Sequence, residues 1–428
     1  MSLSRRRFLT VAGATGVAAA LGTPLASGAS RGASGARSLP SPAASGIDHV
    51  IVVCMENRSF DHWLGWVPGA NGVQSGLAYA DDGGTLHPTH HLQDRQGCGF
   101  NDPDHSYEGG RVQWHNGACD GFRRGSNDDF ALGYYTKDDL PLTSALVESF
   151  TVFDAWFCSI LGPTYPNRFY THAAATDRIT NSSDTSTLPT VWDRLTDAGV
   201  PAAYFHSDLP FLALWGSKYL PLSRPIESFF ELARAGRLPA YSYLDPLFLG
   251  EDQGGSNDDH PHADILRGQA LLSSIVRAAT ASPQWSSTVL IITYDEWGGF
   301  FDHVAPPVRA DADRAHAQAG FRVPTIVVSP FAPRHAVAHQ HYDHASILKL
   351  VEWRWGLKPL SARDAAARNL AEALDFTAPN RRPPTIPRVL DPGPHVCRTP
   401  DKGMAATDPI WFDLKSVAAQ HGWRTARR

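Results

Sequence analysis

Apolar runs of strand length, alternating with segments of helical periodicity, constrain the fold of this chain most strongly. The runs are rich in β-branched residues and lie at 49–55, 151–157, 201–206, 287–294 and 323–329. Segments with helical periodicity lie at 188–198, 226–236, 262–281 and 345–356. Apolar strands separated by helices are typical of a mostly parallel sheet covered on both faces. The sequence therefore predicts an α/β fold with a central, mostly parallel sheet between two layers of helices.

The chain has 428 residues, which is compatible with one large α/β domain. We place this domain at 47–428. Within it, residues 72–132 are rich in Gly, His, Asp and Asn and have little periodicity, which predicts a loop-rich insert. The segment after residue 377 is rich in Pro and predicts a C-terminal strap over the surface.

The N-terminus has the order of regions found in an export signal. Arg5 and Arg6 precede a short apolar run from Val11 to Leu21, and small residues follow. This order predicts a twin-arginine signal peptide at 1–29, followed by a flexible leader at 30–46. The protein is then expected outside the cytoplasm, with the twin-arginine export machinery as a partner. The alternative is a basic, disordered tail.

Charge and cysteine content exclude some classes of function. A formal net charge of −5 argues against a protein that binds nucleic acid through bulk positive charge. The five cysteines form no C-x-x-C pair, which argues against a zinc ribbon or a thioredoxin-like site. Cys98 and Cys119 could form a disulfide across the insert. Cys54 and Cys158 lie in apolar runs and are expected to be buried thiols.

Acidic and amide side chains follow two of the expected strands. Glu56 and Asn57 come directly after 49–55, and Asp295 and Glu296 come directly after 287–294. In open parallel sheets, ligands bind beyond the carboxyl ends of the strands. Clustered oxygen ligands at that edge favour a divalent cation such as Zn, Ca, Mg or Mn. The alternative for each carboxylate is a helix cap or an ion pair with Arg.

Thr164 is a candidate nucleophile. It lies near the expected start of a helix, because Pro166 suits a first-turn position. A helix N-terminus offers N–H groups to an anion, and a Thr hydroxyl beside a metal loses its proton more readily. Asn167 and Arg168 could hold the oxygens of the anion or fix the loop. The alternative for Thr164 is an ordinary helix cap.

Several histidines form a third group of candidates. A His near a bound anion can donate to its oxygens or protonate a leaving alkoxide. For each of them the alternative is a surface or capping role. The candidates are His105, His115, His260, His262, His303 and His344.

Five segments, taken in order, resemble one known family. They are ENRSFDHWLG, GPTYPNRFY, DDHPHAD, YDEWGGFFDHVAPP and GFRVPTIVVSPFAP. Together they are similar to the bacterial phospholipase C and acid phosphatase family, which belongs to the alkaline phosphatase superfamily. The resemblance covers about residues 47–356. It implies an α/β/α sandwich with one catalytic metal.

The resemblance also implies roles for individual residues. Glu56, Asn57, Asp295 and Glu296 match the metal-binding positions, and Thr164 matches the nucleophile. His260, His303 and, less closely, His105 match groups that contact phosphate or protonate the leaving alcohol, with His260 the first choice for the acid. We assign Asn167, Arg168 and His115 to substrate binding. Asp258 and His262 stand four residues apart, as ligands of a second metal do in two-metal relatives, and we interpret that spacing as coincidence.

These expectations define a secreted metal-dependent phosphoesterase. The expected substrate is a glycerophospholipid or a glycerophospho-head-group, cleaved through a phospho-threonine intermediate, with transient contact to a membrane surface. The segment 90–120 is expected to wall the pocket, and Trp63, Trp114 and Trp297 could face a cationic head group, although core packing is the commoner use of Trp. A phosphomonoesterase, a sulfatase-type hydrolase and a non-catalytic binding protein are the alternatives. The chain ends before the C-terminal β-domains of some membrane-active relatives, which weakens the case for a bilayer substrate.

Overall fold

The structure, a computed structural model, describes residues 39–397 and 409–425. The expected signal peptide at 1–29 and most of the expected leader lie outside the described residues. Residues 39–46, which we assigned to the leader, are described and include a short 3₁₀ helix at Pro42–Ala44. The chain divides into units 1–38 and 39–428, and the following description concerns the second unit alone.

An eight-stranded sheet forms the centre of this unit, in the order β13-β6-β12-β11-β1-β10-β8-β9. All of its neighbouring pairs are parallel except those that β12 makes with β11 and β6. The strands are β1 His49–Met55, β6 Thr151–Phe153, β8 Ala202–His206, β9 Ser223–Pro225, β10 Tyr241–Asp245, β11 Thr288–Tyr294, β12 Thr325–Val328 and β13 Ala336–Ala338. Short two-stranded pairs are made by β2 Ala78–Ala80 with β3 Leu86–Pro88, β4 His90–His91 with β5 Gly133–Tyr134, and β7 Trp156–Phe157 with β14 Tyr342–Asp343. The predicted mostly parallel sheet is therefore confirmed.

The central strand β1 has the bounds that the sequence predicted. Its residues Val50, Ile51, Val52 and Val53 have no exposed surface, as expected for a strand covered on both faces. It pairs with β11 on one side and with β10 on the other.

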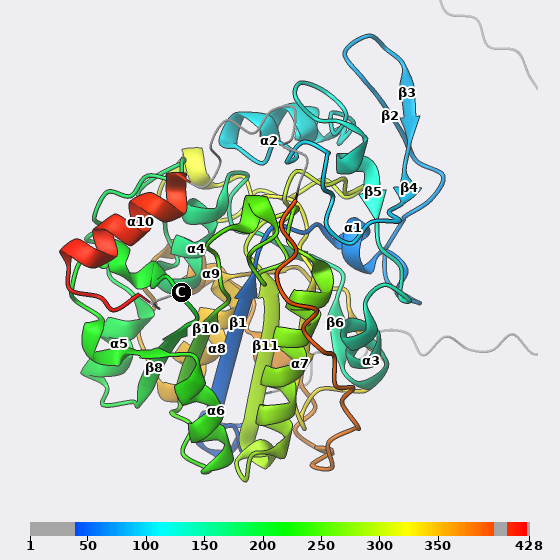
Figure 1. The fold of residues 1–428 in the computed structure, drawn as a ribbon. Coiled ribbons are helices and arrows are strands. Elements are labelled where there is room, and N and C mark those ends of the chain that lie inside the picture. Colours follow the sequence, from blue (N-terminus) through cyan, green and yellow to red (C-terminus); the bar gives the residue numbers. More distant parts are fainter. Residues whose placement is uncertain (1–38, 398–408, 426–428) are drawn as a thin grey trace, which may run out of the picture. The chain divides into compact units, whose positions relative to one another are not determined.

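Helices cover both faces of the sheet, as Figure 1 shows with α7 in front of the strands and α8 behind them. One layer contains α3, α6 and α7: helix α7 contacts α3, α6 and strand β11, and helix α3 contacts strand β12. The other contains α4, α5, α8 and α9. The helices are α1 Phe60–Leu64, α2 Tyr107–Trp114, α3 Pro141–Ser149, α4 Thr164–Ala173, α5 Val191–Asp197, α6 Glu227–Arg234, α7 Ile265–Ala281, α8 Ala345–Trp355, α9 Ala362–Ala366 and α10 Pro409–Gln420.

The structure departs from the predicted elements in several places. The run 151–157 is two strands, because the chain bends at Asp154 and Ala155 between β6 and β7. Strand β10 was not predicted, although it is the neighbour of β1. Helix α10 was not predicted either, since its twelve residues follow the Pro-rich strap.

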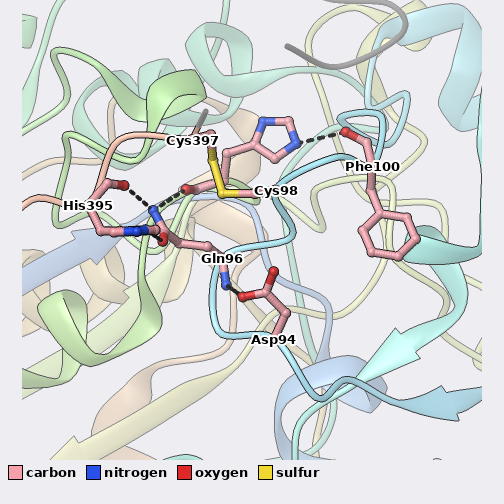
Figure 2. Close-up of a disulfide and its surroundings, with 7 residues drawn as sticks. Asp94, Gln96, Cys98, Phe100, His395 and Cys397 are labelled. Atoms are coloured by element: carbon pink, nitrogen blue, oxygen red, sulfur yellow. Dashed lines mark hydrogen bonds between the residues drawn. A yellow bond between two sulfur atoms is a disulfide. The ribbon is translucent and has the colours of Figure 1, made fainter. Parts of the chain in front are cut away.

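The disulfide considered possible between Cys98 and Cys119 is not the one that forms. Cys98 is bonded to Cys397, 299 residues away, with a Cα–Cα distance of 5.5 Å (Figure 2). The bond joins the insert to the end of the strap, which crosses the surface of α7: Ser273 donates to Pro387 O, and Arg277 donates to Ile386 O. Cys119 is a free, buried thiol, and Cys54 and Cys158 are buried thiols as predicted.

Among residues 39–397 and 409–425, no helix combines the length and the apolarity that crossing a bilayer requires.

Candidate active site

The two predicted pairs of polar residues meet at one edge of the sheet. Met55 and Tyr294 are in register at the carboxyl ends of β1 and β11, so the residues that follow them emerge side by side. The N–H of Asn57 donates to Asp295 Oδ1 at 3.1 Å, and the N–H of Arg58 donates to the carbonyl of Glu296 at 3.0 Å. Parallel pairing therefore produces this cluster directly, as the sequence predicted.

Burial makes the cluster electrostatically costly. Glu56, Asp295 and Glu296 have no exposed surface. Burial raises the pKa of Glu56 well above its usual value, and the neighbouring Asp295 and Asp258 carboxylates raise it further. Burial also raises the pKa of Glu296, to about 8. Ionised carboxylates this close together repel one another, so they can all stay ionised only if a positive charge lies among them.

Arg168 supplies part of that positive charge. Its guanidinium is completely buried and donates to Glu56 Oε1 at 2.8 Å, to Asp295 Oδ2 at 3.2 Å and to Asp245 Oδ1 at 2.7 Å. The sequence places Arg168 among the substrate-binding residues, but in the structure its guanidinium binds these carboxylates and the backbone carbonyls of Cys54 and Met55 in β1. These contacts give it the role of holding the carboxylates in place.

Asp245 is a residue that the sequence analysis missed. It ends β10, the strand beside β1, and accepts from both Arg168 and the hydroxyl of Tyr204. Its signal in the sequence is the acid at the end of YSYLD, between Pro239 and Pro246.

Thr164 lies beside this cluster as the first residue of α4, where backbone N–H groups point out of the helix. The side-chain hydroxyl of Thr164 is 3.4 Å from Glu56 Oε2. The preceding loop is held by Asn167, whose side chain accepts from the N–H of Ile160 and donates to the carbonyls of Ile160, Gly162 and Pro163. Of the two roles that we considered for Asn167, these contacts match the fixing of the loop.

His105 and His260 lie together at the same site. Their ring centroids are 6.1 Å apart, and His105 Nε2 is 3.5 Å from Asn57 Nδ2 and 3.9 Å from Glu296 Oε1. His260 Nε2 is 3.8 Å from Asp102 Oδ2 and 3.8 Å from Glu251 Oε1, two further acids that the sequence analysis did not single out.

The two histidines are in different electrostatic environments. The carboxylates of Glu296 and Asp102 raise the pKa of His105 to about 9, against the opposing effect of its burial. Burial, together with the nearby His105, lowers the pKa of His260 well below its usual value. The site therefore pairs a histidine that favours its cationic form with one that favours its neutral form.

Two predicted residues lie in other surroundings. His303 Nδ1 contacts Asp61 Oδ2 at 2.5 Å, and Arg322 pairs with Asp61 at 3.0 Å. His115 is half-exposed and pairs with Asp120 at 2.7 Å. Within the part of the chain that the structure describes, no hydrogen bond or ion pair joins either histidine to Thr164 or to the four predicted metal ligands.

A cavity of about 430 Å³ opens beside the site. Its lining includes Asp102, His105 and Tyr107 from the insert, Pro163 directly before Thr164, and Asn181. The insert therefore forms one wall of this cavity, as expected. Trp63 and Trp297 are buried in the core and Trp114 is only partly buried, so the first two serve core packing.

The residues at the edge of the sheet are compatible with a divalent cation. Asn57 Oδ1 and Glu296 Oε1 are buried oxygens with no hydrogen-bond partner among the described residues, which is unusual for buried polar atoms. Oxygen atoms of this kind suit a hard cation. A second compact group, Asp102, His105 and His260, could also ligate a metal, as could Asp61, Asp302 and His303. In the last group, however, Arg322 already pairs with both acids.

Comparison with known proteins identifies the family. The sequence model of the Phosphoesterase family matches residues 47–358. The chain is 29% identical over 393 residues to non-specific phospholipase C6 of Arabidopsis thaliana, covering 81% of this chain and 76% of that protein. It is 30% identical over 417 residues to phospholipase C B of Mycobacterium tuberculosis (strain ATCC 25618 / H37Rv), covering 78% of each.

Among solved structures, a protein of the alkaline phosphatase superfamily from Vibrio parahaemolyticus aligns with 12% identity and a TM-score of 0.35, over 54% of this chain and 63% of that one. The family match and the relatives show that the chain belongs to the Phosphoesterase family and is a phosphoric ester hydrolase, which confirms the resemblance noted in the sequence.

Proposed function

We propose that this protein is a secreted, metal-dependent phosphoesterase of the phospholipase C type with Thr164 as its nucleophile. The observation that carries the proposal is the position of the Thr164 hydroxyl, 3.4 Å from Glu56, at the edge where both acidic pairs converge. A hydroxyl at a helix start beside clustered oxygen ligands is suited to attack on phosphorus.

The metal would be held by Glu56, Asn57, Asp295 and Glu296. The chemistry that a divalent cation supplies in such a site is polarisation of the phosphoryl oxygens and a lower pKa for a neighbouring hydroxyl. Arg168 stabilises the proposed ligand set, because its hydrogen bonds fix the carboxylates of Glu56 and Asp295 in one orientation. Asn167 fixes the loop that ends at Thr164.

The chain's own residues then account for two steps. The Thr164 hydroxyl gives up its proton to solvent and Oγ1 attacks phosphorus, the bond from phosphorus to the leaving alcohol breaks, and a histidine of the His105–His260 pair gives the alcohol its proton. Water then hydrolyses the phospho-threonine and releases the phosphate product. The Glu296 and Asp102 carboxylates raise the pKa of His105, which makes His105 the better proton donor. Burial lowers the pKa of His260, so His260 would contact the phosphate group in its neutral form, which reverses the order that the resemblance suggested.

The proposed substrate is a phosphodiester, either a glycerophospholipid or its glycerophospho-head-group. The relatives named above are called phospholipases C, which favours a diester whose head-group phosphate is left on Thr164. Transient contact with a membrane surface would follow for a lipid substrate. A phosphomonoester is the alternative.

Export is proposed from two observations. Arg5 and Arg6 open the signal-like N-terminus, and engagement of the twin-arginine machinery would follow from it. The Cys98–Cys397 disulfide favours an oxidising compartment.

The test is hydrolysis of bis-p-nitrophenyl phosphate and p-nitrophenyl phosphate by the purified mature protein, with and without a chelator. Chelator-sensitive preference for the diester is the expected result. Preference for the monoester would replace the diester assignment by a phosphatase. Equal rates with and without chelator, in protein shown to be metal-free, would contradict metal dependence.

A further inference from the structure

The Cys98–Cys397 disulfide lies beside the two segments that carry the acids and histidines of the active site. Segment 98–105 of the insert runs from Cys98 to Asp102 and His105. The second segment, 251–262, carries Glu251 and His260. The end of the strap contacts both: Cys397 is bonded to Cys98 (Figure 2), and its N–H donates to the carbonyl of Gln253.

Hydrogen bonds around the disulfide join these segments directly. Gln96 is buried; its side-chain amide donates to the carbonyl of His395 at 2.5 Å and to that of His262 at 3.4 Å. His395 Nδ1 donates back to Gln96 Oε1 at 2.7 Å. The side chain of Gln96, in the insert, therefore binds both the strap and segment 251–262, called the histidine segment below.

Two further bonds complete the connection. The N–H of Cys397 donates to the carbonyl of Gln253 at 3.1 Å, and His262 Nε2 donates to the carbonyl of Phe100 at 3.2 Å. Gly254 lies where the segments meet, and a Cβ there would collide with both the Gln96 amide and the His395 carbonyl. This close approach requires glycine, so the junction is tightly packed.

Other bonds hold the histidine segment on the side of the sheet. The N–H of Glu56 donates to the carbonyl of Asp258 at 2.8 Å, and the hydroxyl of Tyr294 donates to Asp259 Oδ2 at 2.7 Å. Arg58, which follows β1, donates to the carbonyl of Asp259 at 2.6 Å and to that of His260 at 3.1 Å. The proposed metal ligands lie on the turns after β1 and β11. Among residues 39–397 and 409–425, no hydrogen bond joins Gln96, His395, Cys98 or Cys397 to these ligands.

We infer that the disulfide, with Gln96 and His395, is a clamp that positions His105 and His260 for catalysis. The inference rests on the proposed function of this site. The clamp sets the spacing of the two segments that carry the histidines, whereas the metal-binding turns are held by the sheet. Opening it therefore lowers turnover and phosphate binding without releasing the metal, and Arg58 keeps the histidine segment from detaching entirely.

Reduction of the disulfide in the intact protein is the direct test. A phosphine reductant breaks the S–S bond and gives two thiols, while the phosphine becomes its oxide. Cys98 and Cys397 are only half-buried, so the reagent can reach them, and alkylation with mass spectrometry verifies which thiols form. We expect kcat for the diester to fall about tenfold or more, because small displacements of reacting groups are costly. Inhibition by inorganic phosphate should weaken in parallel, and metal content should stay constant. Reoxidation should restore both kcat and the inhibition by phosphate.

Two variants separate positioning from general stability. Gln96→Met keeps the disulfide and the side-chain length but removes the hydrogen bonds, and it should lower kcat and phosphate binding while the metal stays bound. Cys119→Ser removes a free thiol of the same insert, and it should respond to reductant as the wild type does.

Unchanged kcat and unchanged phosphate inhibition after verified reduction would overturn the inference. Loss of metal together with activity would also overturn it, because the clamp would then act on the metal site. If the oxidised protein hydrolyses neither ester, the proposed function fails, and calorimetric binding of inorganic phosphate to oxidised and reduced protein still tests the clamp.

Discussion

Replacing Arg168 by Met tests the electrostatic design of the site. Arg168 is completely buried and pairs with Glu56, Asp245 and Asp295, three carboxylates that are buried as well. Met preserves most of the apolar stem and removes the charge. The variant therefore leaves buried carboxylates without the guanidinium that they face.

The magnitude follows from the cost of breaking a buried ion pair, about 3–5 kcal/mol. Globular proteins unfold with an entropy of about 2 cal/mol/K per residue, or roughly 0.9 kcal/mol/K for this chain. The free energy of unfolding of Arg168→Met should thus fall by about 3–5 kcal/mol, and Tm by about 3–6 °C. The loss should be largest with chelator present, because Glu56 and Asp295 are proposed metal ligands and a bound cation would partly replace the lost charge.

Urea unfolding of the wild type and of Arg168→Met, each with and without chelator, measures this effect. The double variant Arg168→Met/Asp245→Asn is the matched control, because it also removes one of the stranded carboxylates and should recover at least about 1 kcal/mol. A chelated Arg168→Met protein within about 1 kcal/mol of the wild type would refute the reasoning.

Two other variants test separate parts of the account. Asp295→Asn should lower the metal content measured by plasma mass spectrometry after dialysis, whereas Asp302→Asn, a buried acid paired with Arg322, should leave it unchanged; full occupancy in Asp295→Asn would remove that residue from the ligand set. Burial and the neighbouring Asp364 raise the pKa of Glu352 to about 9 in the folded protein. The folded state then keeps a proton that the unfolded state loses near pH 4.5, so stability declines as pH rises from about 4.5 to 9. Glu352→Gln should therefore raise the free energy of unfolding at pH 8 by about 1–2 kcal/mol, discounted for partial exposure, and have little effect at pH 4; an equal effect at both pH values would contradict the assignment.

The sequence predicted the centre of the fold because the signal there is local. Strand β1 consists of apolar, mostly β-branched residues and ends where Glu56 begins, so its bounds could be read directly. The meeting of Glu56 and Asn57 with Asp295 and Glu296 followed from one rule, that parallel strands present their carboxyl ends at the same edge. The roles of these residues as metal ligands remain predictions.

The missed features depend on contacts between distant parts of the chain. Strand β10 carries Ser242 among aromatic residues and lies between two prolines, so its pattern does not resemble the other buried strands. The partner of Cys98 is 299 residues away, and spacing along the chain favoured the nearer Cys119. Arg168 follows the proposed nucleophile Thr164 by four residues, as a substrate-binding residue could, and only the fold shows that its guanidinium faces three carboxylates.

Trapping the covalent intermediate on Thr164 tests the central claim most directly. Metal-loaded protein is mixed with excess bis-p-nitrophenyl phosphate, quenched in acid within the first turnovers, and digested for mass spectrometry, with Thr164→Ala treated in parallel. The account predicts a p-nitrophenyl phosphoryl group on the peptide that contains Thr164, and neither adduct nor turnover in Thr164→Ala, whose fold and metal content should match the wild type. Normal turnover by Thr164→Ala, or an adduct on another residue, would contradict the account.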